Sequence, residues 1–303
     1  MRVLSLFDGM SCGQLALKKA GIKVDQYFAS EIDKYAIKVT QANFPNTIQL
    51  GDVQNVTPDK VGKIDLLIGG SPCQGFSFAG KQLNFEDPRS KLFFEYVRLL
   101  KELKPKYFLL ENVRMKKESQ DVISNFLGVE PIAINSSLVS AHFRQRLYWT
   151  NIPNISVPED KGIVLQDILE NGYTDRCKSH CIDANYFKGG NLKSYFEKHR
   201  RQLVFNKPLQ INPSKKAGGK QPYIQDRVFD VRGKSHALTA SFASRTNVGG
   251  EGLEWRKLTP LECERLQTVP EGYTDHVSNT QRYRMLGNGW TVDVIAHMFG
   301  GIE

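Results

Sequence analysis

The sequence predicts an α/β fold: a doubly wound parallel sheet accompanied by a second, smaller and loop-rich domain. Two observations predict it. Over residues 1–150, short apolar runs alternate with segments whose apolar residues recur at helical spacing, which is typical of strand–helix–strand units. From about residue 151, prolines and glycine pairs interrupt this pattern, and aromatic and basic residues are mixed, as in YFKGGNLKSYFEKHRR.

Strands are expected at apolar runs that end in polar or glycine residues, namely 3–7, 26–30, 64–68 and 107–110. The run at 64–68 is apolar throughout, as suits a strand buried on both faces. Helices are expected at 14–20, 33–43 and 92–103, which stop at Gly21, before Pro45 and before Pro105. Helical character returns at 260–267 and 290–299.

Composition places the chain among ordinary globular proteins, since 40% of its 303 residues are hydrophobic and 24% are charged. The sequence has no apolar run of the length that a membrane span needs, and its first residues predict a buried strand rather than a secretory signal. The five cysteines are odd in number and show no disulfide spacing, which favours the cytoplasm. Cys177, His180 and Cys181 lack a second ligand pair, so no metal is expected.

The net charge of +9 is concentrated in one segment. Between Arg176 and Lys257 there are 17 Lys and Arg against 6 Asp and Glu, whereas the rest of the chain has 24 against 26. Such a basic segment is what binding to a polyanion requires, because neutralising phosphates releases counterions. On charge alone, a solvated basic face without a partner explains it equally well.

Polar residues follow the first strands at the sheet edge where ligands of such folds bind. The turn FDGMSCG spans residues 7–13, Glu31 follows the second strand, and Asp52 lies in GDV after the next short segment. Glycines allow a close approach of the backbone to a ligand, and a carboxylate after the second strand can accept both hydroxyls of a ribose. Together these elements favour a nucleoside cofactor.

The segment GGSPCQGFSFAG, residues 69–80, follows a buried strand. Cys73 is therefore expected in a loop at the same edge of the sheet. A cysteine nucleophile must be reachable and thiolate-like, and a loop rich in Gly, Ser, Pro and Gln suits that better than a buried structural cysteine.

The loop SPCQGFS resembles the catalytic loop of the cytosine carbon-5 DNA methyltransferases. The other motifs of that family follow in order: FDGMSCG, Glu31, GDV, ENV at 111–113, RQR at 144–146, RKLTPLECERLQTVP at 256–270 and LGNGWTV at 286–292. The resemblance is closest to bacterial and phage enzymes, although LGNGWTV and YTDHVSN also resemble animal de novo methyltransferases. It covers the chain except roughly residues 155–225, which match the variable target-recognition segment of the family.

The resemblance implies a Rossmann-like sheet that binds S-adenosylmethionine. It implies a discontinuous catalytic domain at 1–155 and 285–303, with a target-recognition domain at 156–284. It also implies that the Cys73 thiolate adds to carbon 6 of a cytosine and activates carbon 5 for methylation. Glu111 would contact the ring nitrogen and the exocyclic amine, and Arg144 or Arg146 would hold the base carbonyl and support Glu111 and Cys73.

The resemblance also implies the cofactor and DNA contacts. Phe7 would pack on the adenine or the methionine portion. Glu31 would hold the ribose, Ile32 would pack on the adenine, and Asp52 would bond the adenine amine. The full set expected around S-adenosylmethionine is Phe7, Asp8, Gly9, Ser11, Gly13, Glu31, Ile32, Asp52, Val53, Pro72, Leu92, Asn288, Gly289 and Trp290. The candidate DNA contacts are Gln74, Ser77, Arg89, Arg227 and Thr239.

The expected partner is double-stranded DNA, from which the target base must be flipped, because carbon 5 is inaccessible inside a duplex. A separate restriction endonuclease would act on the same sequence if the enzyme belongs to a restriction system. We expect a monomer that does not bind membranes. Three alternatives remain. They are a transfer-RNA cytosine methyltransferase, whose Cys-Phe-Thr motif is not evident, and an exocyclic-amine DNA methyltransferase, whose Asp/Asn-Pro-Pro-aromatic loop is absent. The third is a catalytically silent DNA-binding protein, which would not need Cys73, Glu111, Arg144 and Arg146.

Overall fold

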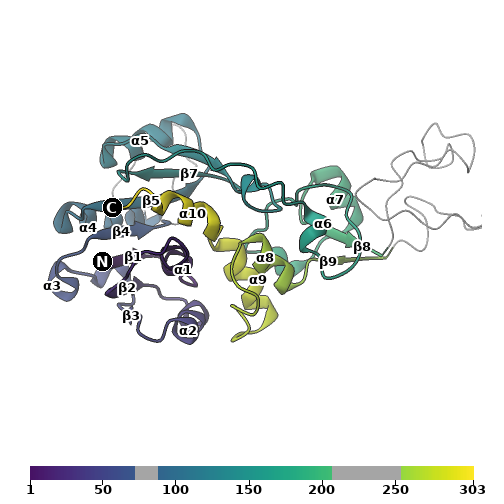
Figure 1. Ribbon diagram of the computed structural model, residues 1–303, viewed down its shortest axis with the longest axis horizontal. Helices are drawn as coiled ribbons and strands as arrows, with labels where there is room; N and C mark the ends of the chain where they lie inside the picture. The colour runs from purple at the N-terminus through teal and green to yellow at the C-terminus, as the bar shows by residue number, and fades with distance from the viewer. Residues whose placement is uncertain (72–87, 207–253) are drawn as a thin grey trace, which may run out of the picture.

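The structure, a computed structural model, describes residues 1–71, 88–206 and 254–303. Within these ranges a central sheet of seven strands has the order β3-β2-β1-β4-β5-β7-β6 (Figure 1). Its strands are β1 (Arg2–Leu6), β2 (Gln26–Ser30), β3 (Ile48–Gln49), β4 (Leu66–Gly69), β5 (Tyr107–Val113), β6 (Ile132–Asn135) and β7 (Gln145–Thr150).

Strands β3, β2, β1, β4 and β5 are mutually parallel, as predicted, but β7 is antiparallel to both β5 and β6. The expectation of an entirely parallel sheet is therefore corrected at this edge. The antiparallel pairing has a consequence for the site, because its register places Val113 opposite Arg146 and Glu111 opposite Tyr148. Glu111 of β5 and Arg146 of β7 thus lie on neighbouring strands.

Two hydrophobic clusters cover the two faces of the sheet. Alternate residues of β1, β2, β4, β5 and β7 enter different clusters: in β1, Val3 belongs to one, whereas Leu4 and Leu6 belong to the other. The first cluster packs under α1 (Cys12–Lys19), α2 (Lys34–Asn43) and α10 (Val292–Phe299). The second packs under α3 (Pro58–Val61), α4 (Pro88–Leu103) and α5 (Lys117–Leu127). Helices on both faces make the sheet doubly wound.

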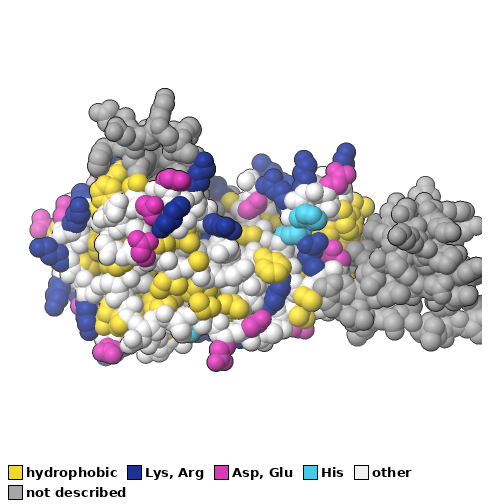
Figure 2. All heavy atoms as spheres, turned by 90° about the horizontal axis from the view of Figure 1, so that it is seen from above, with side chains coloured by type: hydrophobic (Ala, Val, Ile, Leu, Met, Phe, Trp, Pro, Cys, Tyr) yellow, Lys and Arg dark blue, Asp and Glu magenta, His cyan; other side chains and the backbone are white. Residues whose placement is uncertain are grey.

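A smaller region extends from the large domain (Figure 1). It contains α6 (Leu165–Ile168), η4 (Tyr186–Lys188), α7 (Leu192–Lys198) and a two-stranded ribbon of β8 (Leu203–Phe205) and β9 (Trp255–Lys257). Its own small core is formed by Tyr195, Leu203 and Phe205. Figure 2 shows Lys and Arg side chains gathered on this region, where Lys193, Lys198 and Arg200 are exposed.

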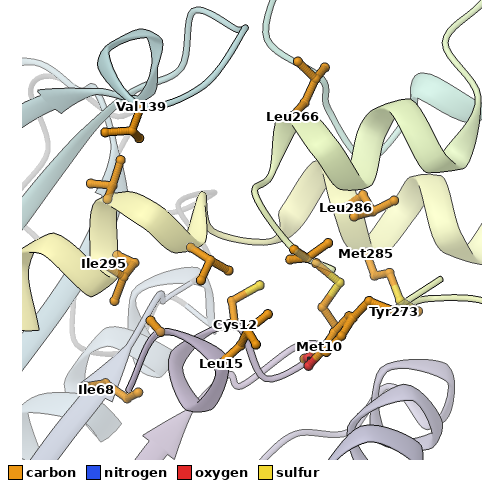
Figure 3. Close-up of a cluster of buried hydrophobic side chains, with 14 of the residues drawn as sticks. Met10, Cys12, Leu15, Ile68, Val139, Leu266, Tyr273, Met285, Leu286 and Ile295 are labelled. Atoms are coloured by element: carbon orange, nitrogen blue, oxygen red, sulfur yellow. The ribbon is translucent and has the colours of Figure 1, made fainter. Parts of the chain in front are cut away.

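The C-terminal helices return to the N-terminal part of the sheet. They are α8 (Pro260–Leu266), which begins with a capping box of Thr259 and Glu262, α9 (Asn279–Asn288) and α10. Figure 3 shows Met285 of α9 and Tyr273 near Met10, and Leu286 of α9 and Ile295 of α10 belong to the same buried cluster as Met10, Cys12 and Leu15. The chain's last 25 residues therefore complete the core that β1 and α1 begin.

The remaining short elements are η1 (Val53–Asn55) and η3 (Ser136–Leu138). None of the helices in the described ranges has the length and hydropathy of a membrane span.

Gly287 provides a test of how tightly α9 packs against the smaller region. A Cβ on Gly287 would lie 2.1 Å from the backbone carbonyl carbon of Asp183 and 2.3 Å from its oxygen. Because backbone cannot yield as a flexible side chain does, Gly287→Ala should destabilise the protein by about 1–3 kcal/mol or more. Thermal unfolding measures this, with Thr280→Ala on an exposed position of the same helix as the control. Equal melting temperatures for the two variants would contradict the packing.

Candidate active site

A cavity of about 530 Å³ opens at the carboxyl ends of β1, β2, β4 and β5. Its walls come from segments far apart in sequence: the turn after β1, the residues after β2, the segment around Asp52, the end of β5, and the junction of α9 with α10. Residues from Phe7 to Trp290 therefore meet in one place. This is the edge at which the sequence predicted a ligand.

The turn after β1 has a backbone conformation that most residues avoid. Phe7, Gly9 and Ser11 all have positive φ, at 57°, 59° and 65°. For Phe7 and Ser11 this left-handed conformation costs free energy, and such strain is common at functional sites. The amide of Asp8 is held by the carbonyl of Ser30, and the amide of Ser11 by the carbonyl of Asp8. The turn directs Phe7, Asp8 and Gly9 toward the cavity.

The carboxylate of Glu31 is fixed by three backbone amides. Gly9 donates to Oε2 at 2.8 Å, and Ile32 and Asp33 donate to Oε1 at 2.7 and 2.8 Å. The side chain is thereby held against the cavity wall, and Oε2, which has one donor, keeps a lone pair for another. A carboxylate fixed in this way is suited to accepting a hydroxyl of a ribose.

Beside Glu31 the wall changes from polar to apolar. Ile32 is 75% exposed, and Val53 and Leu92 also line the cavity. The carboxylate of Asp52 accepts a hydrogen bond from the amide of Gln54 at 3.0 Å and lies at the same wall. The apolar groups provide a surface for a flat base, and the carboxylate beside them provides an acceptor for the amine of that base.

Glu111, near the end of β5, is a buried carboxylate of the site, with 8% of the residue exposed. Each of its oxygens has one donor: Nε of Arg146 lies 2.9 Å from Oε1, and the indole N–H of Trp290 donates to Oε2 at 3.1 Å. All three residues line the cavity. The ion pair compensates the negative charge that burial would otherwise disfavour.

Arg144 lies just before β7 and points elsewhere. Its guanidinium donates to the carbonyl oxygens of Gly287 at 3.2 Å, Gly289 at 2.7 Å and Ile182 at 3.3 Å. Burial lowers the pKa of Arg144 from its usual value, and the carbonyls at the end of α9 offer partial negative charge in return. Arg144 therefore holds the backbone that carries Trp290, whereas Arg146 holds Glu111.

The structure brings most of the predicted cofactor residues together. Those that line the cavity are Phe7, Asp8, Gly9, Glu31, Ile32, Asp52, Val53, Leu92, Asn288, Gly289 and Trp290. Ser11 and Gly13 are buried behind its wall: Ser11 donates to Asp8 at 2.7 Å, and a Cβ on Gly13 would meet Ile68.

Several predicted residues lie outside the described residues, namely Pro72, Cys73, Gln74, Ser77, Arg227 and Thr239. Arg89 falls in the first turn of α4. Near Cys177, His180 and Cys181, as across the described ranges generally, no three His, Cys, Asp or Glu side chains form a group suited to a metal ion.

Apart from Asn288, the residues that α9 contributes to the cavity were not predicted. Gln281, Arg284 and Met285 line it, and Arg284 is exposed. This helix is polar along most of its length, so its apolar periodicity is weak. The available signal was the pair Tyr283 and Leu286, three residues apart and both buried.

The residues present fit an adenosine-containing methyl donor. The cavity combines an anchored carboxylate at Glu31, an exposed aliphatic face at Ile32 and a second carboxylate at Asp52. A seven-stranded sheet of this order, with its cavity at the carboxyl edge, is the Rossmann-like methyltransferase fold.

Comparison with known proteins identifies the family. The C-5 cytosine-specific DNA methylase family matches residues 1–127 and 137–303. The chain is 31% identical over 309 residues to the type II methyltransferase M1.ScrFI of Lactococcus lactis subsp. cremoris, covering 97% of this chain and 76% of that protein. It is 28% identical over 322 residues to the type II methyltransferase M.HhaI of Haemophilus parahaemolyticus, covering 98% and 93%.

The fold is also shared with a solved DNMT2 structure from Spodoptera frugiperda, a triple mutant, with a TM-score of 0.67 and 21% identity over 99% of this chain and 98% of that one. The chain therefore belongs to the C-5 cytosine-specific DNA methylase family.

Asp8 makes the stability of the site dependent on pH. Burial raises the pKa of its carboxyl from 3.8 to about 6, and hydrogen bonds from the hydroxyls of Ser5, Ser11 and Tyr27 oppose this rise. The folded protein thus binds this proton more tightly than the unfolded chain does. The resulting stabilisation is complete below about pH 4 and is lost as the pH rises through about 6.

Asn is neutral at every pH, so Asp8→Asn should gain stability relative to the wild type between about pH 4 and pH 7. Urea unfolding of both proteins at several pH values measures the difference. A difference in unfolding free energy that stays constant across this range would contradict the assignment.

Proposed function

We propose that this chain is a DNA (cytosine-5-)-methyltransferase that acts on a flipped cytosine in a specific duplex sequence, with Cys73 as the nucleophile. The observation that carries the proposal is the fixed carboxylate of Glu111 in the same cavity as Glu31 and Asp52. Glu111 is suited to holding a pyrimidine, and Glu31 and Asp52 are suited to holding the adenosine of the methyl donor. The family match supports DNA as the substrate.

The other described cysteines are poor candidates for the nucleophile. Cys12 lines the cavity, but burial raises the pKa of its thiol to about 12. Burial also raises the pKa of the Cys263 thiol well above its usual value. Cys177 and Cys181 are exposed and do not line the cavity. Because the thiolate is the reactive form, these properties favour Cys73, which follows β4 in the sequence.

The proposed reaction proceeds by addition and elimination. The Cys73 thiolate forms a bond to carbon 6 of the cytosine, and the ring electrons move to carbon 5. S-adenosylmethionine, when bound, supplies an electrophilic methyl group, which carbon 5 attacks as S-adenosylhomocysteine leaves. A base, for which a water molecule is suited, then removes the proton from carbon 5, and the electron pair expels Cys73 to restore the ring.

Glu111 stabilises the adduct through the ring nitrogen and the exocyclic amine. Arg146 supports it, because its Nε binds Glu111 at 2.9 Å and no described residue accepts a hydrogen bond from its Nη2. That nitrogen is therefore available for the base carbonyl. The contacts of Arg144 with three carbonyl oxygens favour a supporting role for this residue instead.

The smaller region is proposed to bind the DNA. Its exposed Lys193, Lys198 and Arg200 provide positive charge for phosphates, which sets the register of the protein on the duplex. Residues 156–284 would then form the target-recognition domain, and residues 1–155 with 285–303 the catalytic domain. We infer a monomeric enzyme of the restriction-modification or orphan type, and any cognate endonuclease would act separately.

Removal of the Cys73 thiol tests the nucleophile. Cys73→Ser should reduce methyl transfer to duplex DNA by at least about 10³-fold while DNA binding stays close to that of the wild type, because only the reacting atom changes. Transfer of a radiolabelled methyl group and a gel-shift titration measure the two properties. Cys177→Ser, at an exposed position outside the cavity, is the matched control and should keep its turnover.

Undiminished turnover of Cys73→Ser would refute the proposed nucleophile. Faster methylation of transfer RNA than of duplex DNA by the wild type would refute the proposed substrate.

A further inference from the structure

The donors to Glu111 come from two unrelated parts of the chain. Arg146 belongs to β7, which pairs directly with β5, whereas Trp290 lies 179 residues beyond Glu111, between α9 and α10. The two donors bind different oxygens of one carboxylate, Oε1 and Oε2. Rotation of the carboxylate would therefore break both contacts, so its orientation is fixed.

Gly70 makes room for the contact between Trp290 and Glu111. A Cβ at position 70 would lie 3.1 Å from Oε2 of Glu111 and 3.1 Å from Nε1 of Trp290. These are the two atoms that the hydrogen bond joins. A side chain here would press on both partners, so the glycine that follows β4 permits this bond.

The backbone on both sides of Trp290 is anchored. The carbonyl of Gly289 accepts from Arg144 at 2.7 Å and from Gln267 at 3.1 Å. The hydroxyl of Thr291 donates to Gln267 at 2.9 Å. Because these contacts fix the main chain, the indole N–H is a preorganised donor rather than a mobile one.

The chemistry of the indole suits a positioning role. Its N–H only donates, so it cannot take a proton from Glu111 or compete with the base as an acceptor. It occupies one lone pair of Oε2 and leaves the others to face the base. The ring of the same side chain lines the cavity that fits the methyl donor.

We propose that Trp290 is a positioning residue for methyl transfer, which orients the Glu111 carboxylate through its indole N–H while its ring forms part of the cofactor wall. The inference rests on the proposed contact of Glu111 with the cytosine. It adds that one side chain connects the cofactor cavity to the group that holds the base.

The test removes the N–H and keeps the ring. Replacing Trp290 with 3-(3-benzothienyl)alanine by nonsense suppression substitutes sulfur for the indole N–H, and Trp290→Phe is a genetically simpler second variant. We expect kcat, and the rate of covalent complex formation with DNA containing 5-fluorocytosine, to fall about tenfold or more, the effect of one lost hydrogen bond to a charged group. The Kd for S-adenosylmethionine, measured by calorimetry, should change less than about threefold, because the ring remains.

Trp149→Phe is the matched control. Its indole donates to Ser124 at 3.0 Å within the core, so its loss should lower stability without lowering kcat. A double-mutant cycle adds a second measurement: Gly70→Ala should lower kcat in the wild type but much less in the benzothienylalanine variant, since the contact is already lost there.

A wild-type kcat in the benzothienylalanine variant would overturn the inference. A loss confined to cofactor affinity, or fully additive effects in the cycle, would also overturn it, because Trp290 would then be only a wall of the cavity. Glu111→Gln distinguishes a failure of the proposed role of Glu111 from a failure of the positioning role of Trp290. If that variant kept full turnover, the proposed role of Glu111 itself would fail, whatever the Trp290 variants did.

Discussion

The site depends on the hydrogen bonds that the Arg144 guanidinium donates to the end of α9. Its donors bind the carbonyl oxygens of Gly287 and Gly289, where the helix leaves carbonyls without intrahelical partners. A cation is favoured at that end of a helix by the aligned peptide dipoles. The contact therefore stabilises a buried charge, and it also holds the C-terminal segment across the edge of the sheet.

The site is built around this returning segment. Trp290 and Asn288 reach the cavity only because the segment is held there, and Trp290 in turn orients Glu111. On the opposite wall, the strained turn at Phe7 and the amides around Glu31 form a rigid surface for the methyl donor. The two halves of the proposed reaction, holding a base and holding an adenosine, thus share one cavity with fixed walls.

Local patterns predicted the elements well where apolar periodicity was strong. The strand at Gln26–Ser30 has the predicted bounds, and the helix ending before Pro105 begins only four residues earlier than expected. The strand β7 was not among the predicted strands, and its antiparallel direction is set by tertiary pairing, which a single run of residues does not encode. Helix α9 was missed because its buried face is narrow and most of its residues are polar.

At the site, the motifs predicted which residues lie close together but not which partner each side chain contacts. Arg144 and Arg146 are two residues apart, so they would point the same way if both lay on one strand. The strand begins at Gln145, so Arg144 precedes it and turns to the carbonyls of α9, while Arg146 binds Glu111. Likewise Ser11 and Gly13 belong to the predicted turn but lie behind the cavity wall, where they support Asp8 and close packing on Ile68.

The most direct test of the central claim is a crystal structure of the chain with S-adenosylmethionine and duplex DNA that carries 5-fluorocytosine at the methylated position. We expect a flipped base whose carbon 6 is bonded to Sγ of Cys73. Glu111 should lie within hydrogen-bond distance of the ring nitrogen, with Trp290 still donating to the Oε2 of Glu111. A target cytosine that remains stacked in the duplex, or a bond to another residue, would contradict it.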